Sequence, residues 1–126
     1  MKKTIGILFV LCIEVWVGYR VIVGIQFNRN CGGHLKRAAD ANTIELARDE
    51  LQIAVDYLEK ECMTEGYTSI YYNTPDEDVG FWYTNINSAL QELKSANPEA
   101  SQLEKSNLLM KLRETLMDND SSGDSV

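Results

Sequence analysis

The chain has one histidine and three cysteines, the residue types that most often bind metals or act as nucleophiles. Cys31 and His34 form a Cys-x-x-His pair, and a thiolate with an imidazole could supply two ligands to a soft metal such as zinc. No other residues complete such a site at a readable spacing. We therefore expect no bound metal, and we interpret His34 as a residue at the start of a helix, beside a free or structural cysteine.

Three consecutive acids, Asp76, Glu77 and Asp78, raise the question of calcium, because carboxylate oxygens are its usual ligands. The stretch lacks the alternating ligands and the glycine of an EF-hand loop. Carboxylates are favoured in the first turn of a helix by the helix dipole, so we interpret the three acids as a helix start.

Motifs for catalysis are missing from the sequence. There is no G-x-S-x-G sequence and no phosphate-binding glycine loop. With one histidine, a Ser/His or Cys/His site would have to use His34. We expect a protein that is not an enzyme and that uses no cofactor.

Aromatic residues cluster between positions 67 and 83. They either close the end of a thin helical core or form a recognition surface, because Tyr and Trp are enriched in binding hot spots. The consecutive residues Phe81, Trp82 and Tyr83 cannot all face one core from one helix, so at least one ring points elsewhere. The predicted contact residues for a partner are Tyr71, Tyr72, Phe81, Trp82 and Tyr83.

An apolar run from Thr4 to Phe27 precedes these residues. As a helix with a rise of about 1.5 Å per residue, it is long enough to cross a hydrocarbon layer about 30 Å thick. Its apolar side chains contribute about 6 kcal/mol in favour of insertion, and Glu14 near the centre opposes insertion by about 3 kcal/mol. Arg20 opposes it less, because its long side chain can reach the interface. We predict a single transmembrane helix.

The two charges in the run are about 120° apart on a helix, so Glu14 and Arg20 cannot easily pair with each other. A carboxylate inside a membrane indicates contact with a partner helix or a polar cavity. The alternative is a neutral Glu14 that lipid tolerates. We include Glu14 and Arg20 among the predicted partner contacts.

A cleaved secretory signal is the main alternative to a retained anchor. Lys2 and Lys3 form a positive start, but a cleavage site after Gly24 would have the bulky Ile22 where a small residue is preferred. The paired lysines favour a cytosolic N-terminus and an acidic domain outside the cytosol, while basic residues just after the run oppose this orientation.

The rest of the chain is acidic. The net charge is −7, from 12 basic and 19 acidic residues. From Asn30 onward 8 basic and 18 acidic residues remain, a net charge of −10. This charge argues against direct nucleic-acid binding and against electrostatic attachment to anionic lipid.

The periodicity predicts an all-α chain with an N-terminal transmembrane helix and a small three-helix, up-down-up domain. One long helix should run from His34 to about Glu65, with Gly66 as its stop. A second should start at the Thr74-Pro75 cap and run to Ala96, and a third should run from residue 98 or 102 to Met117. The predicted divisions are an anchor at 1–29, a joint at 30–33, the acidic domain at 34–117 and a disordered tail at 118–126.

Cys31 and Cys62 flank the long predicted helix, which would separate them by about 45 Å, so we expect no disulfide between them. We expect a single-pass membrane protein that acts as a non-catalytic accessory or interaction subunit. Its partner would be another protein or a second copy, bound through the transmembrane helix and the aromatic residues. The alternatives are a membrane-anchored, extracytoplasmic ligand-sensing domain and a secreted helical protein with a cleaved signal peptide.

Overall fold

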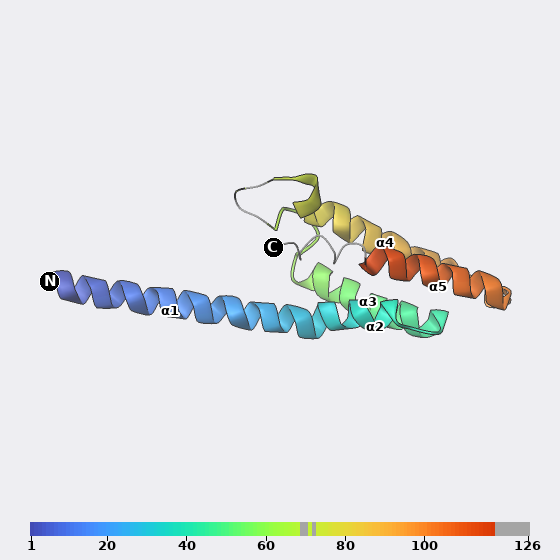
Figure 1. Cartoon of the computed structure of the whole chain (residues 1–126), viewed down its shortest axis with the longest axis horizontal. Coiled ribbons are helices and arrows are strands. Elements are labelled where there is room, and N and C mark those ends of the chain that lie inside the picture. The colour runs from blue at the N-terminus through green and yellow to red at the C-terminus, as the bar shows by residue number, and fades with distance from the viewer. Residues whose placement is uncertain (69–70, 72, 118–126) are drawn as a thin grey trace.

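A computed structural model describes residues 1–68, 71 and 73–117 of the chain. Tyr72 and the predicted disordered tail at 118–126 lie outside this range. Within it the chain is helical and forms no β-strand, so the prediction of an all-α protein with a long apolar N-terminal helix is confirmed. Figure 1 shows that helix projecting from a bundle formed by the remaining helices.

Helix α1 comprises Lys2–Phe27. No proline interrupts it, and its surface is exposed from Lys3 to Ile22. Of the described helices, the continuous one at Lys3–Ala39, of which α1 is the first part, is long and apolar enough to cross a membrane.

The predicted joint at 30–33 is helical and continues the helix beyond α1. Asn28–Gly32 forms a π-helix, η1, and Gly33–Ala39 continues as α2. The backbone N–H of Gly33 donates to the Asn28 carbonyl five residues earlier. A Cβ atom at Gly33 would lie 3.1 Å from that same oxygen, and one at Gly32 would lie 3.1 Å from Asn28 Oδ1. The two glycines therefore allow the wider turn without interrupting the helix.

The predicted long helix from His34 to Glu65 is wrong, because the chain reverses within it. Helix α2 ends at Ala39, and α3 begins at Ile44 and ends at Lys60. Thr43 is extended, with φ −131° and ψ 149°, and its Oγ1 accepts a hydrogen bond of 3.2 Å from the backbone N–H of Leu46. Thr43 is thus an N-cap, and the residues Asp40, Ala41 and Asn42 before it form the turn.

Helix α3 ends in a Schellman motif in which a cysteine takes the position usually held by glycine. Cys62 has a φ of +56°. The N–H of Met63 donates to the Leu58 carbonyl at 2.8 Å, and the N–H of Cys62 donates to the Glu59 carbonyl at 3.2 Å. Met63 also packs against the cluster that contains Leu58, the apolar contact that accompanies this motif.

The second predicted helix starts later than expected. Pro75–Glu77 forms a single 3-10 turn, η2, in which the side chain of Thr74 makes no capping hydrogen bond. Helix α4 comprises Val79–Ser95, and its cap is Asp78, whose Oδ1 accepts from the Phe81 N–H at 3.1 Å. Asp78 is extended because it pairs with Tyr67 in an isolated antiparallel bridge. This tertiary contact therefore moves the helix start.

Helix α5 comprises Gln102–Met117, which agrees with the later of the two predicted starts, residue 102. Ser101 and Glu104 form the predicted capping box. The N–H of Ser101 donates to Glu104 Oε2 at 3.0 Å, and the N–H of Glu104 donates to Ser101 Oγ at 3.3 Å.

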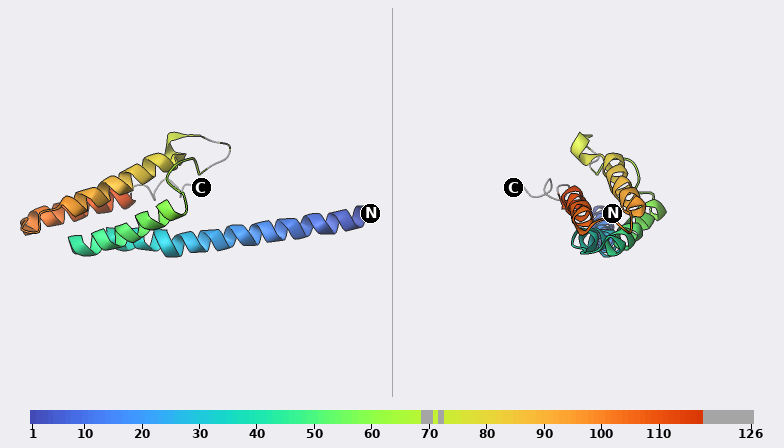
Figure 2. Two further views of the ribbon diagram at one scale, coloured as in Figure 1. Left: turned by 180° about the vertical axis from the view of Figure 1, so that it is seen from behind. Right: turned by 90° about the vertical axis from the view of Figure 1, so that its right-hand side faces the viewer.

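The bundle contains four helices, α2 to α5, in place of the predicted three, because the chain reverses between α2 and α3. Helix α2 contacts α3 and α5, and α4 contacts the same two helices, so the four enclose one interior (Figure 2). At its centre lie Leu51 from α3, Ile86 and Leu90 from α4, and Leu112 from α5. Ala38 from α2 completes it. Successive helices run in opposite directions, so the α3–α4 loop lies at the end of the bundle from which α1 leaves (Figure 1).

Candidate functional site

Two surfaces carry the residues predicted from the sequence: the exposed side of α1 and the end of the bundle from which α1 leaves, which we call the α1 end. Glu14 and Arg20 are both exposed on α1. Among the described residues, neither has an ion-pair partner. The bundle therefore does not account for either charge.

The predicted aromatic contacts separate into core and surface residues. Phe81 is 63% exposed and Tyr71 is 89% exposed. Trp82 packs against both apolar clusters of the bundle. Tyr83 also packs there, and its hydroxyl donates to Glu59 Oε1 at 2.7 Å. Phe81 is therefore the ring of the three that points away from the core, while Trp82 and Tyr83 contribute to it.

The hydrogen bond between Tyr83 and Glu59 joins α4 to α3 at this end of the bundle. It favours the protonated phenol and, with desolvation and the Glu59 charge, raises the pKa of Tyr83 above its usual value. Tyr83 is accordingly a neutral donor near pH 7 in a hydrogen bond between α4 and α3.

The α1 end is hollowed on two sides of Phe27 and Trp82. One groove, of about 550 Å³, lies beside the α3–α4 loop and includes Leu58, Met63 and Phe81 in its walls. The other, of about 520 Å³, lies toward α2 and the end of α5. The Phe27 ring meets the Tyr57 ring edge to face, with centroids 6.4 Å apart. The last residue of α1 is thus a wall of both grooves.

A cluster of polar and charged side chains around the buried Glu50, which sequence reasoning missed, connects α2 to α3. Glu50 is the buried charged residue of the described core, and its side chain is 7% exposed. His34 Nδ1 lies 2.6 Å from Glu50 Oε2, and Arg37 donates to Glu50 Oε1 at 2.7 Å. His34 is the histidine of the Cys-x-x-His pair, and its contact with Glu50 occupies Nδ1. Heptad-like spacing of Glu50 with Ala47 and Leu51 could have indicated its inward position.

The three cysteines are in different environments, and all are free. Cys31 is fully buried against Ala54 and Leu58, and this burial raises its pKa to about 12. Cys62 is exposed at the end of α3 and lines the groove that Leu58 also lines. The expected separation of about 45 Å between Cys31 and Cys62 is therefore wrong, because α3 returns to the end of the bundle where α2 begins.

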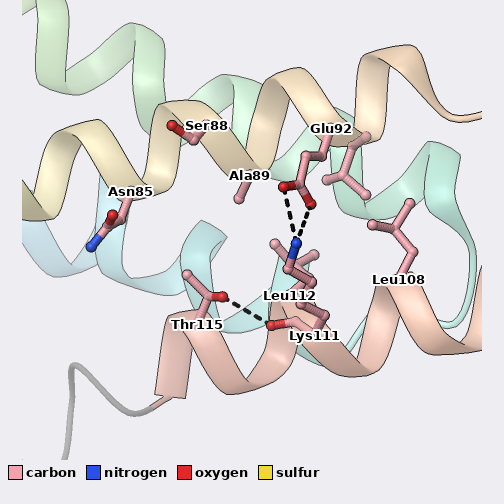
Figure 3. A pocket seen from close by; sticks show the side chains of 9 residues that line it. Asn85, Ser88, Ala89, Glu92, Leu108, Lys111, Leu112 and Thr115 are labelled. Atoms are coloured by element: carbon pink, nitrogen blue, oxygen red, sulfur yellow. Dashed lines mark hydrogen bonds and ion pairs between the residues drawn. The ribbon is translucent and has the colours of Figure 1, made fainter.

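The remaining candidates for chemistry are dispersed. In the described part of the chain, no group of three His, Cys, Asp or Glu side chains is placed to hold a metal ion. Of the three consecutive acids, Asp78 is the cap of α4. Between α4 and α5 a small cleft of about 160 Å³ is crossed by an ion pair, in which Lys111 donates to Glu92 at 3.0 Å (Figure 3). This ion pair joins two exposed helix surfaces.

Comparison with protein-family models, with curated proteins and with solved structures finds no match to this chain.

Proposed function

We propose that the protein is a single-pass membrane-anchored interaction subunit without catalytic activity, in which α1 holds the helical bundle at a membrane and contacts a partner. The observation that supports this proposal best is the exposure of the apolar side chains of α1. From Lys3 to Ile22 its apolar surface is exposed and is not covered by any other described residue. An apolar helix of this length is stable in lipid and costly in water.

Glu14 indicates that α1 does more than anchor. A helix that only holds a domain needs no carboxylate near mid-membrane, and one that remains there usually meets a polar group of another helix. We propose that Glu14 meets a donor on a partner helix or on a second copy of α1. Arg20, six residues nearer the bundle, reaches the interface.

The paired lysines before the span support the bundle on the extracytoplasmic side. The test of retention is N-terminal sequencing of the mature protein. A start at Met1 agrees with the anchor, and a start at Ile25 would contradict it and support secretion after cleavage of a signal.

The test of partner binding compares Glu14→Leu with Arg20→Leu and with wild type during purification from native membranes. We expect the wild-type chain to co-purify with a partner or to form an oligomer. Glu14→Leu should lose that association while remaining in the membrane fraction, because the substitution favours insertion. Retained association in Glu14→Leu would mean that α1 is an anchor only.

A ligand-sensing bundle is the second candidate, and the groove of about 550 Å³ at the α1 end favours it. Grooves of this size, with mixed apolar and polar walls, accommodate small ligands. A thermal-shift screen of metabolites should then find a compound that raises the Tm of wild type but not that of Trp82→Ala. The Tm of each protein with the compound is compared with the Tm of the same protein without it. A screen without any stabilising compound would leave the groove as an incomplete part of the core.

A further inference from the structure

We propose that the α1 end of the bundle rests on the membrane itself, with Tyr67 and Phe81 among the headgroups of uncharged or zwitterionic lipids beside the span. This inference depends on the proposed membrane anchor and assigns a contact to the bundle, which the anchor alone does not require. Four observations support it.

The first observation is the level of the grooves along α1. From Lys3 to Phe27 the helix rises by about 36 Å, at about 1.5 Å per residue. A bilayer is about 30 Å thick in its hydrocarbon and about 40 to 45 Å with its headgroups. With Lys3 at one face of the hydrocarbon, Phe27 lies about 6 Å beyond the other face. Phe27 is therefore at headgroup level, and it is a wall of both grooves.

The second observation is that the bundle cannot easily move away from that level. One continuous helix runs from Lys3 to Ala39, through η1, so no flexible linker separates the span from the bundle. Phe27 packs against the cluster of Cys31, Ala54 and Leu58, and its ring meets that of Tyr57, which ties the end of α3 to the end of α1. The loop after α3 therefore lies beside the point where α1 leaves the bundle, as both lengthwise views show (Figures 1 and 2).

The third observation is the distribution of aromatic rings. Every aromatic residue after Phe27 in the sequence lies between Tyr57 and Tyr83. The large apolar side chains exposed toward the other end of the bundle, such as Leu46 and Leu103, are aliphatic. At the α1 end Tyr67 is 48% exposed and Phe81 is 63% exposed. Tyr and Trp concentrate at membrane interfaces, where an apolar ring and a polar group are both solvated.

The fourth observation is charge, which selects the lipid. The same end carries exposed Glu61 and Glu65 and half-buried Glu77 and Asp78, and these four acids outnumber the exposed basic residues Arg29, Lys36 and Lys60 on that side. These acids are repelled by the negative potential of anionic lipids. The contact is therefore made by the rings, and anionic headgroups should not strengthen it.

The natural cysteines allow a test with the full-length chain in phosphatidylcholine bilayers. A nitroxide on Cys62 in the Cys12→Ala variant reports the α1 end, and a nitroxide on Cys12 in the Cys62→Gly variant reports the span. Cys31 should remain unlabelled, because it is fully buried and its raised pKa keeps the thiol protonated. A nitroxide at Leu103→Cys, in a chain without Cys12 and Cys62, provides the aqueous reference at the opposite end. Collision with oxygen and with a water-soluble nickel chelate measures the depth of each label.

We expect the Cys12 label to lie deep in the hydrocarbon, the Cys62 label at headgroup level, and the Leu103→Cys label in water. In one contrary outcome the Cys12 label is deep, but the Cys62 label is as accessible to the nickel chelate as the aqueous reference. This outcome would overturn the docking and leave the anchor intact. A Cys12 label in water would overturn both. A Cys62 label that reaches headgroup level only after phosphatidylserine is added would overturn the assignment to uncharged or zwitterionic lipid.

The rings are tested separately with Phe81→Ser, and Leu103→Ser is the matched control, because Leu103 is 71% exposed and lies at the other end. Phe81→Ser should shift the Cys62 label toward the aqueous value, and Leu103→Ser should not. Near-UV circular dichroism of Trp82, in the Trp16→Phe background, checks that the bundle remains folded in both variants. An equal shift in the two folded variants, or no shift in either, would contradict the assignment of the contact to the rings.

Discussion

The carboxylate of Glu50 allows a sharp test of what stabilises the packing of α3 against α2 after the chain reverses between them. Its side chain is 7% exposed, whereas those of its partners His34 and Arg37 are 24% and 66% exposed. Removing the carboxylate leaves two groups that water can reach. Removing the two partners leaves a buried charge without compensation. The two perturbations delete the same pair of contacts, so any difference between them comes from desolvation.

The structure gives the expected magnitudes. An uncompensated buried charge costs about 3 to 5 kcal/mol, so His34→Leu/Arg37→Leu should lower the free energy of unfolding by about that amount. Glu50→Leu replaces the carboxylate by an apolar group beside Ala47 and Leu51, and we expect a change within about 1 kcal/mol. In a bundle of this size, a loss of 3 kcal/mol lowers Tm by about 12 to 24 °C.

The assay is urea unfolding at pH 7 in detergent, followed by Trp82 fluorescence in the Trp16→Phe background, so that only the bundle contributes to the signal. Glu92→Leu is the matched control, because it also removes an ion pair between helices, with Lys111 at 3.0 Å, from a side chain that is 48% exposed. It should cost less than about 1 kcal/mol. If Glu50→Leu is as damaging as the double variant, the desolvation argument is refuted.

Three further predictions concern helix ends and the buried thiol. Cys62→Gly should raise the free energy of unfolding by about 0.5 to 1 kcal/mol in the same urea assay, because glycine adopts the positive φ without strain; a loss of stability would contradict the motif. Ser101→Ala should lower it by about 1 kcal/mol through loss of the capping box, and an unchanged midpoint would contradict that cap. Burial raises the pKa of Cys31 from 9.0 to about 12, so the stability that the neutral thiol contributes is complete below pH 9 and is lost as the pH rises toward 12. Urea midpoints should therefore fall more steeply above pH 9 in wild type than in Cys31→Ala, and parallel profiles would contradict this.

Local signals in the sequence determined the features that a single helix needs. The length and hydropathy of α1 follow from its own residues, because a helix satisfies its backbone internally. The capping box at Ser101 and Glu104 was predictable because both partners lie within one turn. An exposed ring among Phe81, Trp82 and Tyr83 followed from helical geometry alone.

Tertiary structure decided the features that depend on residues far apart in the chain. Position 42, although it is Asn, falls where one long helix would have its apolar side, and the packing of α3 against α2 makes the cap at Thr43 the better solution. Asp78 became the cap of α4 because its backbone pairs with Tyr67. The sequence could not indicate that Glu50 pairs with Arg37 and His34, which lie 13 and 16 residues earlier. It also could not indicate that Phe27 meets the end of α3. Short-range hydrogen bonds are encoded where they form, whereas the packing of helices against one another is determined by side chains that only the folded chain brings together.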